Sequence, residues 1–326
     1  SDGTVSANNM WGMMRSSSLN SPISLNTNNV TNMETMFEDA TAFNSALNFS
    51  NTSNVTKMNF MFKNARAFNQ PLNFNTSSVI GMREMFNHAR SFNQNINNWD
   101  VSNVTNMSSM FMNASSFNQD ISGWTPVNVS NFTGMFEDTG SNGIFNSGQA
   151  AGASSTLSWG TGSAISIDRM FMGASAFNGD LSSWDTSSVT NMQDTFKNAL
   201  VFNQDLSNWN TSSATNLKGM FNGATIFNNG LSVGDSSTIM NWSTSSVTTI
   251  ESTFASAPAF NGNISGWDVS SGTDFYGMLR LCNPTKRTLR CPALIDGICQ
   301  LSRIGIRLLF FLFLLEIAFL IYPVQA

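Results

Sequence analysis

The stretch Val189–Trp209 reads VTNMQDTFKNALVFNQDLSNW and contains the pattern that decides the fold. Met192, Phe196 and Ala199 are separated by four and three residues, a spacing that places them on one face of a short helix. We therefore predict a helix over 190–199. A helix of two or three turns is unstable by itself in water, so it must be held by packing against neighbouring parts of the chain.

The second half of this stretch predicts a short strand. Leu206 and Trp209 are followed by Asn-Thr-Ser-Ser, a run of turn-forming residues. We place the strand near Leu206–Thr211. The two apolar residues are three apart, which departs from the alternation of a regular strand, so the strand bounds are approximate.

The same pattern recurs through most of the chain. A Phe preceded by Met or Thr returns at steps of 24 or 25 residues, apart from two longer steps of 35 and 33 residues. This first column, which we expect to form the repeat core, consists of Phe37, Phe62, Phe86, Phe111, Phe136, Phe171, Phe196, Phe221 and Phe254. A second column of Phe-Asn pairs contributes Asn44, Asn69, Asn93, Asn118, Asn178, Asn203, Asn228 and Asn261. A third column is aromatic and consists of Phe49, Phe74, Trp99, Trp124, Trp184, Trp209, Trp242 and Trp267.

A single copy is too small to bury its apolar side chains, so neighbouring copies must stack into one continuous core. We predict an α/β repeat solenoid. Its expected form is a coil with one short parallel strand and one short helix in each turn of about 25 residues.

Charge and composition divide the chain into regions. The net charge is −9 over residues 1–279 and +4 over 280–326, and the three cysteines all lie in the second region. The predicted organisation is a degenerate N-terminal repeat (1–29), a solenoid (30–279) with insertions near 141–161 and 230–242, a basic Cys-containing segment (280–303) and an apolar tail (304–326).

The tail leaves four interpretations open. Leu308–Tyr322 is apolar apart from Glu316, and extension to Ile304 gives nineteen residues but adds Arg307. A membrane-spanning helix needs about twenty apolar residues. The tail is a translated non-coding or frame-shifted end, a transmembrane anchor, a removable lipid-anchor signal, or a helix that covers the end of the solenoid. Membrane association through 304–322 belongs to the second of these.

Composition excludes several function classes. The chain has 326 residues, of which 41% are apolar and 11% are charged, and its net charge is −5. An acidic chain lacks the phosphate-contacting surface of a nucleic-acid-binding protein, so we expect no nucleic-acid partner. Three cysteines do not build a disulfide framework. One histidine, His88, excludes any mechanism that needs two imidazoles. We find no catalytic constellation and expect neither an enzyme nor a cofactor.

Two stretches of the repeat carry a family resemblance. MFMNASSFNQDISGWTPVNVSNFTGMF and MFMGASAFNGDLSSWDTSSVTNMQDTF resemble the repeat of BspA-like, mycoplasma-type surface proteins, an atypical relative of the leucine-rich repeat. The resemblance covers about residues 30–279. It implies a right-handed, leucine-rich-repeat-like solenoid with one short strand and one short helix in each turn. It also implies an extracellular or cell-surface location, and an adhesive or binding role without shared catalytic residues.

Three polar features are candidate sites. The Asn column is either a ligand-binding amide row or a ladder that satisfies turn backbone groups inside the coil. Asp120, Asp180 and Asp205 occupy one repeated position, where stacked carboxylates could bind calcium; capping of turns is the structural alternative. Rows of Ser and Thr could present a hydroxyl array to a glycan or to ice, or start helices and make turns. The Thr members of these rows are Thr52, Thr76, Thr186, Thr211 and Thr244.

These features lead to two functional hypotheses. The first is a non-enzymatic cell-surface or secreted repeat protein that mediates adhesion or binds an unidentified protein or glycan through the solenoid surface. The second is a structural or hydroxyl-array protein that binds glycan or ice through its stacked Ser and Thr rows.

Overall fold

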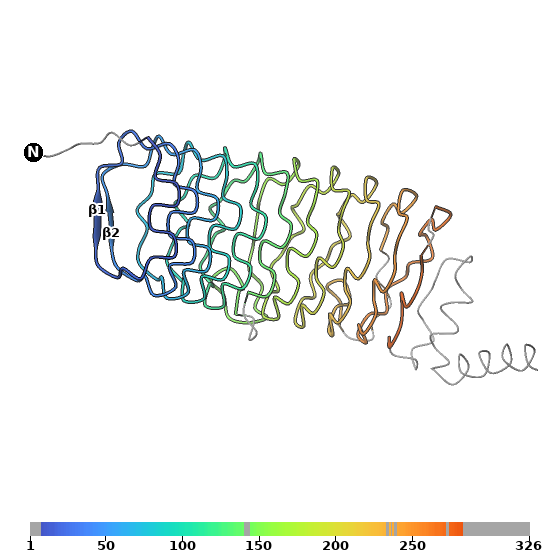
Figure 1. Cartoon of the computed structure of the whole chain (residues 1–326). Coiled ribbons are helices and arrows are strands. Elements are labelled where there is room, and N and C mark those ends of the chain that lie inside the picture. Colours follow the sequence, from blue (N-terminus) through green and yellow to red (C-terminus); the bar gives the residue numbers. More distant parts are fainter. Residues whose placement is uncertain are drawn as a thin grey trace, which may run out of the picture.

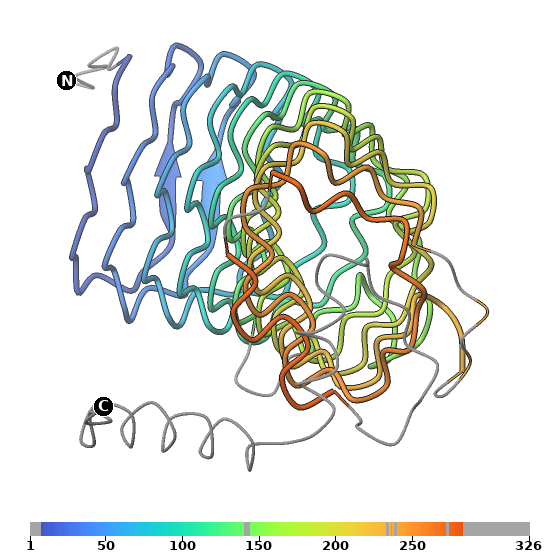
Figure 2. The same cartoon turned by 90° about the vertical axis from the view of Figure 1, so that its right-hand side faces the viewer.

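The computed structural model describes residues 8–139, 144–232, 235, 237, 240–271 and 274–282. The chain winds into a solenoid whose coils lie one behind the other, from the blue N-terminal coils to the orange C-terminal ones (Figure 1). Seen from the C-terminal end, the outlines of successive coils turn relative to one another (Figure 2). The predicted stack of repeats is confirmed.

Backbone pairing between neighbouring coils runs along the whole stack. Isolated parallel bridges connect one residue of each coil to its equivalent in the next, as in Asn106 with Asn131 and Asn191 with Asn216. Because every bridge is parallel and joins sequence neighbours, each coil is positioned by the coil before it and positions the coil after it.

The described residues contain two strands, both near the N-terminal end (Figure 1). β1 (Ile23–Leu25) and β2 (Leu47–Phe49) pair in parallel. Their central residues, Ser24 and Asn48, are exposed, while the flanking apolar side chains are buried or half-buried. This is the alternation expected of a strand with one face toward the core.

The helix predicted over 190–199 is wrong, because the described residues form no helix. Backbone N–H groups in this segment alternate between two kinds of acceptor. The N–H of Phe196 donates to the carbonyl of Met220 in the next coil at 2.8 Å, whereas the N–H of Lys197 donates to the carbonyl of Asp194 at 3.1 Å. An α-helix would instead direct every N–H to the carbonyl four residues earlier.

Backbone conformation explains why no helix forms. Asp194 and Asn198 have φ values of 51° and 58°, in the left-handed region. Glu84 and His88 occupy the same two positions in an earlier coil, with φ values of 53° and 58°. A left-handed residue interrupts a right-handed helix, so each coil forms a run of tight turns in place of the expected α layer. The α/β, leucine-rich-repeat-like assignment is therefore incorrect.

The strand predicted near Leu206–Thr211 is also absent. The N–H of Trp209 donates to the carbonyl of Leu206 at 3.1 Å, which closes a turn. In β2 the equivalent residues Leu47 and Phe49 are two apart, whereas Leu206 and Trp209 are three apart. The additional residue converts an extended segment into a turn.

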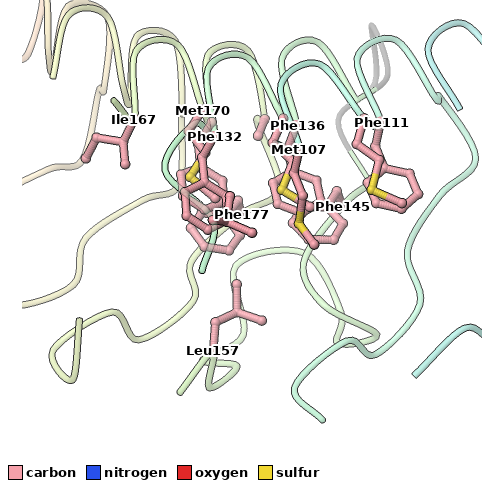
Figure 3. Packing of buried hydrophobic residues seen from close by; sticks show 14 of the residues in the cluster. Met107, Phe111, Phe132, Phe136, Phe145, Leu157, Ile167, Met170 and Phe177 are labelled. Carbon is pink, nitrogen blue, oxygen red and sulfur yellow. The ribbon is translucent and has the colours of Figure 1, made fainter. Parts of the chain in front are cut away.

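Aromatic side chains form the continuous core predicted from the repeats. All nine Phe residues of the first column are fully buried. Phe111 stacks on Phe136 of the next coil with ring centroids 5.7 Å apart, and on Phe117 of its own coil at 4.0 Å. Figure 3 shows this packing among side chains of successive coils. The buried residues join into one cluster from Met10 to Cys282.

The coil with the longest step keeps the same columns. Phe145 lies between Phe117 and Phe177, with centroids 6.0 and 5.9 Å away. Trp159 stacks in the same way within the Trp column. Phe145 was missed as a column member because it follows Phe136 by nine residues, where the other coils have six. The extra residues near 141–161 are therefore distributed around residues that stay in register.

Candidate functional site

The Asn column forms an unbroken ladder of hydrogen bonds. The Oδ1 of each Asn accepts a hydrogen bond from the backbone N–H of its equivalent one coil later. For example, the Oδ1 of Asn178 accepts the N–H of Asn203 at 2.9 Å. The series starts at Asn20, passes through Asn146 and ends at Asn261. The structural interpretation of the column is confirmed. An amide row for ligand binding would need the same oxygen atoms, which the backbone already occupies.

Two ladder residues also hold the inserted loops. The Nδ2 of Asn146 donates to the carbonyls four and seven residues later, at 2.6 and 2.8 Å. The Nδ2 of Asn228 donates to the carbonyls at the same two offsets, at 2.8 and 2.9 Å. The insertions near 141–161 and 230–242 thus leave the coil at equivalent positions and start with the same bonds.

The threonines expected to form a hydroxyl array are buried. Thr52, Thr76, Thr186, Thr211 and Thr244 are each at most 3% exposed. Each Oγ1 donates to a carbonyl of the next coil, as from Thr186 to Asn210 at 2.9 Å. The array built on these five residues is therefore wrong: their period reflects a second internal ladder.

A different Thr row faces solvent. Its exposed members, at the position just before each bridge residue, are Thr31, Thr105, Thr190, Thr215 and Thr248, with Thr56 half-buried. Ile80 and Ile165 interrupt the row and are 51% and 53% exposed. The sequence period is the same for the buried and exposed rows, so burial decides which hydroxyls a partner could contact.

Indole nitrogens of the Trp column form a third ladder. The Nε1 of Trp124 donates to the carbonyl of Ile96 at 2.9 Å, and the later Trp residues make equivalent bonds. Trp99 is the first Trp in the column, and its buried Nε1 has no hydrogen-bond partner. The coil before Trp99 carries Phe74 in an extended segment, so it does not present the turn whose carbonyl accepts elsewhere.

The calcium candidates act as turn caps in this structure. An Oδ1 of Asp120, Asp180 and Asp205 accepts the N–H of the residue two positions later at 2.8–2.9 Å. Thr156 pairs with Asp180 from the preceding coil, so a coil without a carboxylate separates Asp120 from Asp180. Within the described residues, no group of three or more His, Cys, Asp or Glu side chains could hold a metal ion.

Charged residues are distributed unequally around the coil. We call the run from the bridge residue to the residue after the buried Ala the Met–Phe segment; in one coil it is Asn191–Leu200. Every Lys and Arg of the described residues lies in such a segment. The described acidic residues outside the Met–Phe segments are all Asp. Each caps a turn by accepting the N–H of the residue two positions later.

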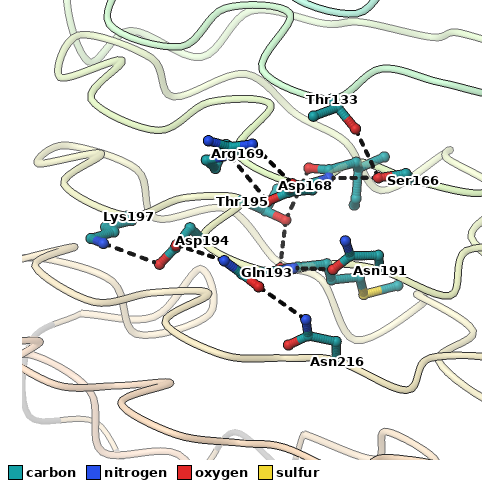
Figure 4. A network of polar contacts seen from close by, with 12 residues as sticks. Thr133, Ser166, Asp168, Arg169, Asn191, Gln193, Asp194, Thr195, Lys197 and Asn216 are labelled. Carbon is teal, nitrogen blue, oxygen red and sulfur yellow. Dashed lines mark hydrogen bonds and ion pairs between the residues drawn. The ribbon is translucent and has the colours of Figure 1, made fainter.

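The Met–Phe segments exchange polar contacts across coils (Figure 4). Lys197 and Asp194 form an ion pair at 3.4 Å, and Asp194 accepts a hydrogen bond from Gln193. Gln193 in turn accepts one from Asn216 of the next coil at 3.1 Å. Most of these side chains are only partly buried, so their bonds contribute little individually.

Two acids of this face are partly removed from water. Burial raises the pKa of Glu137 above its ordinary value, and nearby Arg169 offsets part of that effect. Burial likewise raises the pKa of Asp168, which Arg169 opposes through its charge and a hydrogen bond. The pKa of Asp100 shifts in the opposite direction, because hydrogen bonds from Ser102 lower it. His88 is half-buried, and desolvation lowers its pKa.

A surface groove lies at the N-terminal end, beside β1 and β2. Its volume is about 690 Å³ and none of its lining residues is ionisable at neutral pH. The apolar side is formed by Leu25, Leu47, Phe49 and Phe74, and the polar side by Ser24, Asn26, Asn28, Asn48, Ser50 and Asn73. Phe49 and Phe74 stack with ring centroids 5.7 Å apart and planes 2° apart.

Two local departures from the repeat produce this groove. The first three coils keep the two-residue spacing of Leu47 and Phe49, so the segment stays extended here and forms a turn elsewhere. In addition, Phe49 and Thr52 are three residues apart, whereas the equivalents in the coils before and after are two apart. Ser50 is thus part of a bulge, a feature that re-aims side chains at sheet edges.

Several expectations fall outside the described residues. The basic segment, apart from its first three residues, and the whole apolar tail belong to the part of the chain that the structure does not describe. Cys282 is described and buried, and burial raises the pKa of its thiol to about 12. Among the described residues, no helix is long and apolar enough to cross a membrane.

The groove and the unequal charge distribution were missed at the sequence level. Both signals are nonetheless present in the sequence. The groove follows from one residue that the early coils lack and from one residue, Ser50, that a single coil adds. The charge distribution follows from comparing positions across the aligned copies.

Comparison with known proteins assigns the chain to a family. No curated protein matches the sequence. One family model matches it repeatedly, over residues 3–74, 72–148, 139–239 and 232–289, and so includes all of the described solenoid. The chain therefore belongs to the family described as "Mycoplasma protein of unknown function, DUF285".

Proposed function

We propose that this chain is a non-enzymatic repeat protein that binds protein or glycan partners through the surface of its solenoid, outside the cell or on its surface. The resemblance to BspA-like repeats supports the location and the adhesive role. The described coils contain tight turns in place of helices, so the proposal draws on the repeated columns and not on leucine-rich-repeat geometry.

One observation carries the proposal: positions that face inward repeat, while outward positions of the Met–Phe segment differ from coil to coil. The position after the first buried residue of the segment is occupied in order by Glu34, Asn59, Arg83, Ser108, Thr133, Asp168, Gln193, Lys218 and Glu251. Arg83 is exposed, Ser108 is buried and the other seven are half-buried. The next inward column is fully buried and almost invariably Met or Thr. Packing requires the constant columns and leaves the outer ones free to vary.

A varied surface on a regular scaffold suits recognition. Repeat proteins use extended faces of stacked units to contact partners, and changes in the outward positions alter specificity without affecting the core. Mixed charges here would favour a protein partner, because charge complementarity contributes specificity and association rate. Outside the Met–Phe segments the described residues carry only Asp among acidic and basic side chains, which would suit a neutral or hydrated partner.

The exposed Thr row favours a second candidate. Thr190 and Thr215 stand in adjacent coils, which are spaced about 4.8 Å apart in a parallel ladder, and both are exposed. A regular hydroxyl row could bind a repetitive glycan or ice. The exposed Ile80 and Ile165 break its regularity, so we rank this candidate second.

The test has two parts. Intact and permeabilised cells that produce the chain with an epitope tag at the loop near residue 150 are stained with antibody, and we expect staining of the intact cells. The purified chain is then applied to arrays of extracellular proteins and of glycans. We expect binding to at least one class, weakened at least tenfold by the double variant Arg83→Ser, Lys218→Ser if the partner contacts the Met–Phe face.

Other results would count against the proposal. Staining that requires permeabilisation contradicts the location, and absence of binding on both arrays contradicts the function. Inhibition of ice growth that is lost in Thr190→Tyr, Thr215→Tyr would favour the second candidate instead. Thr186→Val serves as the control for that variant, because Thr186 is buried.

A further inference from the structure

We propose that the groove over Phe49 and Phe74 is a binding site for a neutral saccharide chain. This inference rests on the proposed binding function and assigns one ligand class to one place on the solenoid. The groove is the feature in which the described chain departs most from its own repeat, through the extended segments of β1 and β2 and the Ser50 bulge.

The aromatic side of the groove offers a stacking surface. Trp residues of the same column are at most 3% exposed, whereas Phe49 is half-buried and Phe74 is 8% exposed. The face of an aromatic ring is negative, and the C–H groups on one face of a pyranose ring are weakly positive and apolar. Phe74 covers one face of the Phe49 ring, so a sugar ring would pack against the part of Phe49 that stays accessible and remove water from it.

The polar side supplies neutral hydrogen-bonding groups. Asn26, Asn28 and Ser50 already form a small network: the Oγ of Ser50 lies 3.3 Å from the Oδ1 of Asn26 and 2.9 Å from that of Asn28. The two amide oxygens share the one hydroxyl hydrogen of Ser50, and the Oδ1 of Asn26 also accepts the backbone N–H of Asn28 at 3.2 Å. Within the described chain, neither Nδ2 is used in a hydrogen bond. Preorganised donors of this kind favour binding because they lose little freedom when a ligand arrives.

The exposed Asn48 and Asn73 extend the polar side along the stack. The Nδ2 of Asn48 donates to the Oγ of Ser24 at 3.3 Å, and the amide oxygen of Asn48 remains available. Asn73 is exposed and lines the groove next to Phe74. Sugar hydroxyls both donate and accept, which matches an amide that offers both functions.

Charge and size restrict the ligand class. A groove without Lys or Arg has nothing to pair with sulfate, phosphate or carboxylate groups, so an uncharged ligand fits best. Its lining residues come from three consecutive coils. Such coils lie about 4.8 Å apart, so the site is about 10 Å long, which accommodates about two sugar rings.

The experiment uses the full chain and defined probes. Neutral hexasaccharides of β-1,4-linked glucose, β-1,4-linked N-acetylglucosamine and α-1,4-linked glucose are titrated by calorimetry, with a sulfated hexasaccharide of heparin as the charged comparison. We expect at least one neutral probe to bind with a Kd of about 1 mM or tighter, and the sulfated probe not to bind at this site.

Matched variants place the binding. Phe49→Ala and Asn73→Ala should each weaken binding about tenfold. Ile165→Ala, an exposed apolar side chain on another coil, and Asn208→Ala, an exposed amide beside Trp209, should leave the Kd unchanged. Because Asn73 is exposed, Asn73→Ala tests the site even if Phe49→Ala disturbs folding, which circular dichroism and thermal unfolding would show.

Contrary results separate this inference from the proposed function. If a saccharide binds and neither Phe49→Ala nor Asn73→Ala weakens it, the groove assignment is wrong while glycan binding stands. If no neutral probe binds, or if the sulfated probe binds with equal affinity, the ligand class is wrong. If a neutral extended peptide binds in the groove and the saccharides do not, the occupant is a protein segment and the inference is overturned.

Discussion

The side-chain oxygen of Asn146 accepts a hydrogen bond from the backbone N–H of Asn178 at 3.0 Å, across one complete coil. The Nδ2 of the same side chain binds two carbonyls of the inserted loop, and Asn146 is fully buried. One amide thus joins two coils and anchors a loop. Its removal should leave buried donors and acceptors without partners.

Asn146→Ala should therefore lower the free energy of unfolding by about 2–4 kcal/mol, because it removes these three bonds and a longer fourth one from the Oγ of Ser155 at 3.5 Å. Denaturation by urea, followed by Trp fluorescence, measures the change. Asn128→Ala is the matched control: its exposed amide makes one bond, to Ser102, and should cost less than about 1 kcal/mol. Equal losses in the two variants would contradict the role of the ladder.

Thr186 and Thr190 belong to the buried and the exposed Thr rows of the same coil. Thr186→Val removes an internal bond and leaves the carbonyl of Asn210 without that donor, so it should destabilise the chain by about 1 kcal/mol. Thr190→Val should change stability by less than about 0.5 kcal/mol, because the residue is exposed. A reversed order in chemical denaturation would show that the assignment of the two rows is wrong.

Trp99 and Trp124 occupy adjacent coils and differ in one hydrogen bond. Trp124→Phe loses the bond to Ile96, whereas Trp99→Phe removes a buried N–H that has no partner. Both variants lose similar ring area, so the difference between them isolates the indole nitrogen. We expect Trp124→Phe to be less stable than Trp99→Phe by about 1 kcal/mol or more in thermal or urea unfolding. Equal stability would contradict this account.

Glu137 should make stability depend on pH in a defined direction. Burial raises its pKa in the folded chain above the unfolded value, so ionisation is less favourable in the fold. Its contribution is therefore most favourable below the unfolded pKa, falls as pH rises toward the folded pKa, and is unfavourable at pH 7.

Glu137→Gln should then be more stable than the parent chain at pH 7 and nearly equal to it at pH 3.5. Thermal unfolding of both proteins across this range measures the difference. Asp100→Asn provides the opposite case, because hydrogen bonds from Ser102 lower the pKa of that carboxyl. Asp100→Asn should be less stable than the parent chain at pH 7 and nearly equal to it at pH 3. The same pH trend in both variants would refute the assignment.

The aromatic columns could be predicted because their spacing is nearly constant. Phe111 and Phe136 are 25 residues apart, and such a period has no simple explanation other than stacking. The Asn ladder followed from the same period. Phe145 was missed because extra residues precede it, although it occupies its regular place in the core.

Local structure was harder to predict. Met192, Phe196 and Ala199 fit a helical face, but three buried positions at this spacing also arise from a run of tight turns. The left-handed conformation of Asp194 and Asn198 distinguishes the two cases. Both residue types tolerate that conformation but also occur within helices at a modest cost, so composition does not decide between the two cases.

The groove could not be found by seeking the repeat, because it arises where the repeat is broken. A two-residue spacing in place of three keeps Leu47 and Phe49 extended, and one added residue places Ser50 in a bulge. A consensus sequence of all the coils shows neither the shorter spacing nor the added residue. The expected stacking of the calcium candidates was affected in a related way: Asp120 and Asp180 share a repeat position, but an irregular coil lies between them.

The parallel bridges also bear on how such a chain can change its length. Each coil receives bonds from one neighbour and passes an equivalent set to the other, so the junctions between coils are interchangeable. Removal of a block such as 191–215 would place Ser166 opposite Asn216 and keep the aromatic columns aligned. Recombination between misaligned copies of the gene can therefore shorten or lengthen the solenoid by whole coils. Recombination that adds or removes part of a coil would interrupt the Asn, Thr and Trp ladders together at the new junction.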